Sequence, residues 1–305
     1  MRKEKRSIGQ KKISQKPDTE LIVAEPSGLL DFLLLKLSNR SRNNVKSLLT
    51  RREILVDGVV VTQYDHPLLA GQKIRISRPT NQGQKQQGVL DIIYEDDDII
   101  VINKPAGLLS ISTDKEKELT AYHLLTDYVR LKNPTNRIFA VHRLDRDTSG
   151  VLMVAKNERI KLALQDNWAD LVSQRAYMAV VEGQLEEKSG RIQSWLKETK
   201  TRIMYSSGKA GDGQESITNY QVIKETPEYS LLDIHLETGR KNQIRVHMKD
   251  IGHNVVGDKK YGAKTNPLKR LGLHAYKLEF KHPFSDKVMC FQTQPPKSFT
   301  ALFKK

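Results

Sequence analysis

The chain contains only one cysteine, Cys290, among its 305 residues. An intrachain disulfide and a zinc site built on paired cysteines are therefore excluded, because each needs at least two thiols. No apolar run approaches the roughly 18 residues of a membrane-spanning helix, and the basic N-terminus lacks the apolar segment of a secretory signal. These absences predict a soluble protein of the cytoplasm, a reducing compartment, with no membrane partner.

Motifs that bind nucleotides, cofactors or metals are missing as well. The glycine-rich stretch 208–213 lacks the form of a phosphate-binding loop, and within 257–265 Ala263 stands where that loop needs lysine. No GxGxxG follows an apolar run, so a Rossmann-type methyltransferase is not predicted. The histidines form neither HExxH nor a His/Cys pair at ligand spacing. We therefore expect no metal and no nucleotide cofactor.

What the chain has in excess is positive charge. Lys and Arg number 51 and Asp and Glu 36, which gives a net charge of +15. Such a charge attracts polyanions over long range, and the usual polyanion is nucleic acid. Composition alone leaves open a soluble basic protein without such a partner. Separate basic segments suit an extended polyanion better than one small acidic substrate, and they comprise residues 1–16, 40–52, 197–209, 240–249 and 259–270.

Composition also divides the chain into parts. Residues 1–20 form a basic arm that we expect to be disordered. Residues 79–88 contain proline, glycine and polar amides but no apolar side chain, which predicts a linker. We therefore predict a small domain over residues 21–78 and a larger domain over residues 89–305.

The small domain has the pattern of two helices followed by strands. Apolar residues predict a helix over 29–37, and Ser41 can cap a second helix. Asp57-Gly58 between two apolar runs predicts a hairpin, and a third strand is expected at 73–77. This order resembles the S-four-like RNA-binding domain, which is named after a small-subunit ribosomal protein. The stretches that carry the resemblance are LLDFLLLKL, SRNNVKSLLTRREILVDG and AGQKIRI.

The resemblance of the small domain implies an RNA-binding surface. The basic side chains that would form it are Arg40, Arg42, Lys46, Arg51 and Arg52. Arg42 and Lys46 lie four residues apart and so share one helix face. A solvated helix face without a ligand stays open as the alternative interpretation.

The larger domain is rich in strands joined by short turns, which favours an antiparallel or mixed sheet and an α+β fold. The acidic run 95–98 lies between the first two strands and predicts a solvated turn rather than a metal site. Helices are expected near 120–131 and 158–168. The predicted strands span residues 90–94, 98–103, 138–141, 151–155, 176–182, 216–223, 230–236, 244–247 and 277–282.

The most informative segment is 141–157, VHRLDRDTSGVLMVAKN. A polar loop here joins two apolar strands and places several ionisable side chains at the strand ends, a usual location for chemistry. An aspartate held in a turn is the structural alternative. The string HRLDRDTSG resembles the central motif of the RluA-type family of RNA pseudouridine synthases. Further stretches resemble motifs of that family in the same order, so that the resemblance covers residues 89–300; they are 94–107, 175–183, 236–247, 252–262 and 273–283.

This resemblance implies an isomerase that detaches uracil from ribose at nitrogen 1 and rejoins it through carbon 5, without a cofactor. It assigns the reacting carboxylate to Asp145 and its partner to Arg245, whose two-pronged pairing would keep a carboxylate ionised in a dry pocket. A phosphate contact is the alternative for Arg245. Tyr177 corresponds to the tyrosine that packs on the target uracil, the alternative being a core tyrosine. Arg143 corresponds to the arginine that replaces the flipped base in its stack.

One departure from the family is visible, because Lys241-Asn242 stand where Thr-His is common, and no role is carried over to them. We expect a monomer that acts on large-subunit (23S) ribosomal RNA, since family members with such an N-terminal domain mostly act there. A tRNA pseudouridine synthase and a noncatalytic RNA-binding ribosome-assembly factor are the alternatives. A glycosidase would need a second carboxylate, for which Asp147 is the only close candidate.

Overall fold

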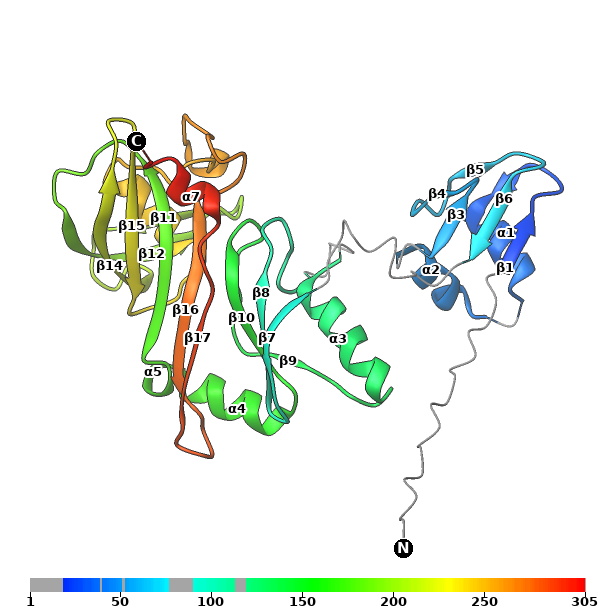
Figure 1. Ribbon diagram of the computed structural model, residues 1–305, viewed down its shortest axis with the longest axis horizontal. Helices are drawn as coiled ribbons and strands as arrows, with labels where there is room; N and C mark the ends of the chain where they lie inside the picture. Colours follow the sequence, from blue (N-terminus) through cyan, green and yellow to red (C-terminus); the bar gives the residue numbers. More distant parts are fainter. Residues whose placement is uncertain (1–18, 39, 51–52, 77–89, 113–118, 305) are drawn as a thin grey trace, which may run out of the picture. The chain divides into compact units, whose positions relative to one another are not determined.

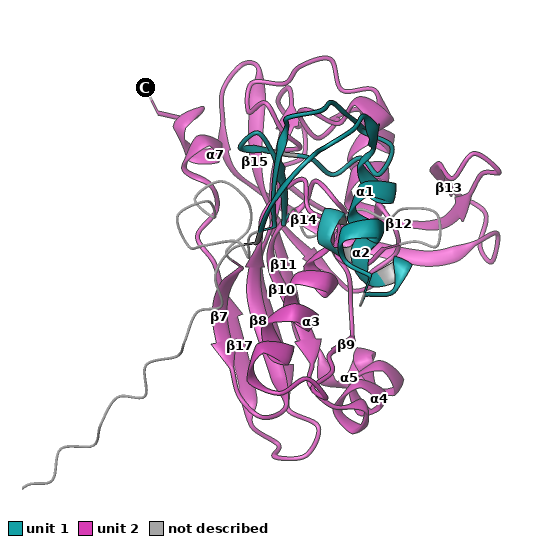
Figure 2. Cartoon of the chain, turned by 90° about the vertical axis from the view of Figure 1, so that its right-hand side faces the viewer, with its two compact units in different colours: residues 1–89 teal, residues 90–305 magenta. Residues whose placement is uncertain are grey.

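The computed structural model describes residues 19–38, 40–50, 53–76, 90–112 and 119–304 (Figure 1). The chain divides into two compact units, residues 1–89 and residues 90–305 (Figure 2). The predicted linker 79–88 and nearly all of the predicted arm 1–20 lie outside the described residues. None of the helices in the described ranges is long and apolar enough to cross a membrane.

The first unit packs two helices against an antiparallel sheet with the strand order β1-β6-β3-β4, and β2 pairs separately with β5. One apolar core joins the helices to the sheet, with Leu33, Val45, Ile54 and Ile74 fully buried in it. The predicted helices, hairpin and third strand are confirmed, and β1 was not predicted. The elements are β1 Thr19–Ile22, β2 Ser27–Gly28, α1 Leu29–Lys36, α2 Arg42–Thr50, β3 Ile54–Val56, β4 Val59–Val60, β5 Pro67–Leu68 and β6 Lys73–Ile76.

The turn between β3 and β4 shows why Asp57-Gly58 specifies a hairpin. Both residues have positive φ angles, +48° and +84°, as the tight turn of a two-residue hairpin requires. The Asp57 carboxylate also accepts hydrogen bonds from the Lys73 N–H and from Gln72 Nε2, each at 2.9 Å. The turn residue therefore also ties the hairpin to β6.

In its described residues, the second unit is built on one eleven-stranded sheet with the order β13-β12-β14-β15-β11-β16-β10-β8-β7, where β17 pairs with β16 and β9 with β10. Among the described strands of this sheet, β10 and β16 form the one parallel pair. The predicted α+β fold with a mixed, mainly antiparallel sheet is confirmed. The strands are β7 Asp91–Glu95, β8 Ile99–Lys104, β9 Phe139–Ala140, β10 Ser149–Ala155, β11 Gln174–Glu182, β12 Ser189–Glu198, β13 Met204–Ser207, β14 Gln214–Glu225, β15 Tyr229–Leu236, β16 Leu273–Lys281 and β17 Val288–Gln292.

The helices of the second unit are α3 Ala121–Lys132, α4 Glu158–Asp166, α5 Trp168–Leu171, α6 Gln243–Asp250 and α7 Lys297–Ala301, with a 3-10 turn η2 at Lys259–Tyr261. In β8, Ile99 lies in one apolar cluster with Ile160 of α4, whereas Ile100 lies in another with Leu125 of α3. Successive side chains of a strand point to opposite faces. The sheet is therefore covered on both faces here, which explains the unbroken apolar run of β8.

The predicted strand at residues 244–247 is wrong, because these residues belong to helix α6. Apolar residues alternate here at Ile244, Val246 and Met248, which is the period of a strand. In the helix, Ile244 and Met248 lie about one turn apart and share a core cluster with β11 and β15, whereas Val246 packs into a separate cluster with Tyr261. A helix with apolar contacts on two sides thus imitates the pattern of a strand.

Gly150, at the start of β10, occupies a position that a larger residue cannot take without strain. Its φ is +118°, and an added Cβ would lie 2.0 Å from the carbonyl oxygen of Ala275 in β16. We expect Gly150→Ala to lower the free energy of unfolding by roughly 2 kcal/mol or more, because backbone strain and the clash add up. Gly208→Ala is the matched control, since a Cβ there meets no atom within 4 Å. Urea unfolding followed by circular dichroism measures both, and equal midpoints would contradict this expectation.

Candidate active site

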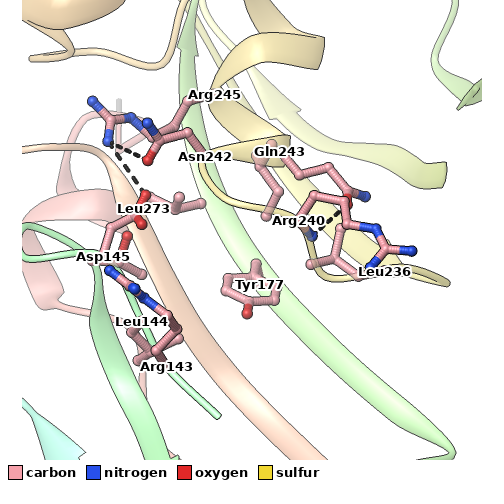
Figure 3. A pocket seen from close by; sticks show the side chains of 12 residues that line it. Arg143, Leu144, Asp145, Tyr177, Leu236, Arg240, Asn242, Gln243, Arg245 and Leu273 are labelled. Atoms are coloured by element: carbon pink, nitrogen blue, oxygen red, sulfur yellow. Dashed lines mark hydrogen bonds and ion pairs between the residues drawn. The ribbon is translucent and has the colours of Figure 1, made fainter. Parts of the chain in front are cut away.

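A small cavity of about 60 Å³ lies where the loop 141–148 meets β11, β15 and α6 (Figure 3). The structure brings Arg143, Asp145, Tyr177 and Arg245 together around this cavity. These are the four residues that the family resemblance singled out in this unit. The other lining residues are Leu144, Thr148, Leu236, Arg240, Asn242, Gln243, Ile244 and Leu273.

The loop that carries Asp145 is held by hydrogen bonds to the segment 104–110. Ser110 Oγ donates to the carbonyl of Leu144 at 2.8 Å and accepts from the Leu144 N–H at 3.1 Å. On the other side of Asp145, the carbonyl of Arg146 accepts from the N–H of Gly107 at 2.9 Å. Because both neighbours of Asp145 are held in this way, the backbone of Asp145 is fixed in place beside the cavity.

Lys104 supports the same loop from inside the protein. Its side chain is fully buried, and its Nζ donates to the carbonyls of Pro105, Leu108 and Arg146 at 2.7 to 3.0 Å. Burial lowers the pKa of Lys104 to about 7, although nearby acidic residues act in the opposite direction. Lys104 lies in the stretch 94–107 that carries part of the family resemblance, but the sequence does not reveal this role, which depends on a carbonyl 42 residues further along the chain.

Arg245 extends from α6 to both the pocket and a buried acid. Its Nε and Nη2 donate to the two carboxylate oxygens of Asp258, each at 2.7 Å. Its Nη1 donates to Asp145 Oδ2 at 3.3 Å and to Asn242 Oδ1 at 3.1 Å. The predicted pairing with Asp145 is confirmed as a single contact, but the predicted two-pronged geometry is wrong, because Asp258 takes it. Burial opposes the charge of Arg245, yet the hydrogen bonds and charges of both acids raise its pKa above the ordinary value.

Helix α6 is held by a buried polar network beneath it. Gln243 Nε2 donates to a backbone carbonyl of β14 at 2.9 Å and to Thr218 Oγ1 at 3.0 Å. One turn further, His247 Nδ1 lies 2.8 Å from Thr218 Oγ1 and its Nε2 lies 2.9 Å from Ser194 Oγ. Burial lowers the pKa of His247 to about 4, so this imidazole is neutral at pH 7. The network ties α6 to β12 and β14 and thereby fixes the direction of Arg245.

Tyr177, on β11, lines the cavity (Figure 3) and packs against two apolar clusters of the second unit. Burial raises the pKa of its phenol to about 12, with Arg175 opposing this shift and Asp145 adding to it. The phenol therefore keeps its proton at neutral pH. It offers a flat ring surface and a hydrogen-bond donor, but it is not a ready base.

Two arginines, Arg143 and Arg240, are exposed and line the pocket. The backbone N–H of Arg240 donates to Gln243 Oε1 at 2.9 Å, and its Nε donates to the carbonyl of Glu215 at 3.1 Å. Sequence reasoning did not single out Arg240, which belongs to the basic segment 240–249. Exposed cations beside the pocket suit a polyanionic substrate.

The predicted RNA contacts of the first unit lie on α2 and just before it. Arg40, Arg42 and Lys46 are exposed, and Lys46 Nζ lies 5.7 Å from the centre of the Tyr64 ring. Arg51 and Arg52 lie outside the described residues. Exposure suits an RNA surface and a solvated helix face equally, so these contacts stay a prediction.

In the acidic run 95–98, Glu95 ends β7 and residues 96–98 form a turn before β8, as predicted. Asp96 Oδ1 accepts hydrogen bonds from the N–H groups of Asp98 and Ile99, each at 2.8 Å, which closes the turn. Across the described part of the chain, no group of three His, Cys, Asp or Glu side chains is placed to hold a metal ion.

The fold and the pocket together define an enzyme with the pseudouridine synthase fold. Residues 98–250 match the sequence profile of the family described as RNA pseudouridylate synthase. An uncharacterized RNA pseudouridine synthase of Mycoplasma pneumoniae is 33% identical over 285 residues, which are 89% of this chain and 90% of that protein. The ribosomal large subunit pseudouridine synthase D of Nitrosomonas europaea is 31% identical over 313 residues, covering 95% of this chain and 89% of that protein. The solved structure of human RNA pseudouridylate synthase domain containing 1 is 28% identical with a TM-score of 0.56, covering 71% of this chain and 89% of that chain.

The chain belongs to the RNA pseudouridylate synthase family. It is therefore an isomerase that acts on RNA. The membership predicted from HRLDRDTSG and the accompanying motifs is confirmed. The finding favours this prediction over the glycosidase and the noncatalytic assembly factor that the sequence alone left open.

Proposed function

We propose that the protein converts uridines of large-subunit ribosomal RNA to pseudouridine, with Asp145 as the nucleophile and without a cofactor. The observation that carries this proposal is the 3.3 Å contact between Asp145 and Arg245 in a pocket that also holds Tyr177. The ribosomal substrate is supported by the likeness to the Nitrosomonas europaea protein, which extends over 95% of this chain.

The target uridine must leave its stack before it can enter the pocket, because a stacked base is inaccessible. Arg143 is exposed beside the cavity, and we assign it to the vacated place in the stack. A planar guanidinium can stack on bases and still contact phosphate, which an ammonium group does less well. Arg240 adds a second positive charge for the flanking phosphates.

In the reaction, the carboxylate of Asp145 attacks C1′ of the ribose and displaces uracil at N1. The detached uracil turns until its C5 faces C1′, and the new C5–C1′ bond forms as the ester to Asp145 breaks. The proton lost from C5 is balanced by the proton that N1 takes up. The C5 proton passes to water and N1 takes up a proton from water, so the product is an isomer of the substrate; no oxidation or group transfer occurs, and the chemistry calls for no cofactor.

The remaining pocket residues orient these groups. Arg245 holds the carboxylate of Asp145 through one charge-assisted hydrogen bond. Tyr177 provides the ring against which uracil packs while it turns, and its protonated phenol can donate a hydrogen bond to a uracil carbonyl. Because helix α6 and the loop 141–148 are both held by buried hydrogen bonds, this arrangement exists before the substrate arrives.

Release of tritium tests the proposed function. Large-subunit ribosomal RNA labelled with tritium at C5 of uridine is expected to release label when the protein is added, whereas transfer RNA and small-subunit ribosomal RNA release none. Carbodiimide treatment followed by primer extension locates the modified uridines, which are the positions that carry pseudouridine in wild-type RNA but not in RNA from a strain that lacks the gene. Release from transfer RNA alone would overturn the ribosomal substrate, and release from none of the three would overturn the proposed reaction on them.

We further propose that residues 21–78 form an S-four-like domain that binds RNA through Arg40, Arg42 and Lys46. The support is their exposure on and beside one helix of the first unit. Residues of this domain bind RNA away from the reacting uridine. Such binding acts equally on the ground state and the transition state, so it lowers KM without raising kcat.

The double change Arg42→Ala/Lys46→Ala is therefore expected to weaken RNA binding and to leave kcat at saturating RNA unchanged. The slope of the logarithm of the binding constant against the logarithm of the salt concentration should become less steep by roughly 1.4 to 1.8, because each lost phosphate contact reduces that slope by about 0.7 to 0.9. Lys73→Ala/Arg75→Ala is the matched control, since it removes two exposed basic side chains from β6 of the same unit. Filter binding over a range of salt concentrations measures both pairs. Equal slopes for the two pairs would argue against an RNA surface on α2.

A further inference from the structure

Asp258 is a buried carboxylate that lies behind Arg245 and does not line the cavity. Its side chain is only 1% exposed, and both of its oxygens accept hydrogen bonds from Arg245 at 2.7 Å. Its backbone is held as well, because its carbonyl accepts from the N–H groups of Tyr261, Gly262 and Ala263. Asp258 is therefore a rigid anchor for the guanidinium.

This anchor decides which part of Arg245 reaches the pocket. A guanidinium carries five N–H donors. Asp258 takes the donor on Nε and one on Nη2, and Asn242 takes one on Nη1. The second donor on Nη1 remains for Asp145, and the ring of Tyr261 lies 5.0 Å from Cζ of Arg245. Asp145 consequently receives one hydrogen bond from Arg245 instead of two.

Two carboxylates thus share one cation, and they share it unequally. Asp258 is closer to Arg245 than Asp145 is, and its side chain is 1% exposed against 22% for Asp145. Charges interact more strongly where water is excluded, so Asp258 compensates most of the Arg245 charge. A nucleophilic carboxylate has to weaken its pairing as it bonds to C1′. A single oriented contact therefore serves Asp145 better than a tight two-pronged pair.

We propose that Asp258 is a positioning residue for the reaction. It holds Arg245 in the orientation that directs Asp145 at the ribose, and it limits their pairing to one hydrogen bond. This inference rests on the proposed role of Asp145 as the nucleophile. The competing explanation is that Asp258 only stabilises its own turn, where its Oδ1 also accepts from the Tyr261 N–H at 3.3 Å.

Asp258→Asn separates these explanations, because asparagine keeps the shape but replaces one acceptor by a donor that repels the Arg245 fork. We expect kcat for tritium release to fall by about 100-fold, the effect of a catalytic group misplaced by about 1 Å. KM for the RNA should stay at the wild-type value. Asp250→Asn is the matched control, since Asp250 is an exposed carboxylate on α6, the helix that carries Arg245, and accepts a hydrogen bond from Ser206. It should change neither constant.

A double-mutant cycle with Arg245→Lys gives the decisive result. If Asp258 acts only through Arg245, the double variant loses no more kcat than Arg245→Lys alone. Additive losses would show that Asp258 acts through its turn and would overturn the proposal. If the Asp258→Asn variant does not fold, the same cycle is carried out with Asp258→Glu. Glutamate keeps the buried pair charged, but its side chain is one methylene longer and so displaces the Arg245 guanidinium. Asp258→Glu should therefore lower kcat in the wild-type background and cause no further loss in the Arg245→Lys background.

Asp145→Asn, measured in the same assay, distinguishes this inference from the proposed function. If Asp145→Asn turns over like the wild type, the proposed mechanism fails and the inference fails with it. If Asp145→Asn is inactive while Asp258→Asn has the kcat of the wild type, the mechanism stands and only the role of Asp258 is refuted.

Discussion

Replacing Asp145 by asparagine is expected to abolish tritium release, lowering turnover by roughly four orders of magnitude or more. The amide has the shape of the carboxylate but cannot attack C1′ of the ribose, and it brings no charge to Arg245 Nη1. RNA binding should persist, because Arg143 and Arg240 beside the pocket are unchanged. Tritium release and filter binding of the same labelled RNA measure the two properties side by side.

The matched control for this change is Asp147→Asn. Asp147 is an exposed carboxylate two residues further along the same loop. It is also the second carboxylate that a glycosidase mechanism would need. We expect Asp147→Asn to turn over near the wild-type rate. If Asp145→Asn did so as well, Asp145 could not be the nucleophile.

The pocket shows how far the sequence can predict a site. Asp145, Tyr177 and Arg245 were identified because each lies in a distinctive string of residues, and the structure brings them together around one cavity. The acid that holds Arg245 in two-pronged geometry was not identified. Asp145 and Asp258 lie 100 and 13 residues from Arg245 in the chain. A sequence motif does not show which of these two acids the fold places beside Nε of the guanidinium.

Asn242 illustrates a second limit of sequence reasoning. It was noted only as a departure from the family pattern, without a role. In the structure it has a left-handed backbone with φ +55°, its Oδ1 accepts from Arg245, and its Nδ2 donates to the Tyr261 hydroxyl at 2.9 Å. Asparagine tolerates this backbone conformation better than most residues. The role follows from the fold around Arg245, which no pattern in the chain reveals.

Buried polar residues are one reason why the secondary structure was predicted only in part. Strand β12 was not predicted, because Ser194 faces the interior, where its Oγ lies 2.9 Å from His247 Nε2. A buried serine is stable there because it has a partner. That partner comes from α6, 53 residues further along the chain, so a local pattern does not reveal why this serine is buried.

Arg245→Lys is expected to lower kcat by roughly 100-fold or more, the effect of a catalytic group misplaced by about 1 Å. Lysine keeps one positive charge but has no fork, so it cannot hold both oxygens of Asp258 and also reach Asn242 and Asp145. Asp145 would lose its orientation while the surface of the protein stays the same. We therefore expect single-turnover tritium release to slow strongly and filter binding of RNA to change little.

Arg191→Lys is the matched control for this change, because Arg191 pairs with Glu237 at the surface, where an ion pair contributes only about 0 to 1 kcal/mol. It should leave both kcat and RNA binding at wild-type values. Wild-type kcat with weakened RNA binding in Arg245→Lys would instead identify Arg245 as a phosphate contact. The structure argues against that outcome, because the Arg245 side chain is 11% exposed. Four of its five N–H donors already bind acceptors of the protein, which leaves one for a phosphate.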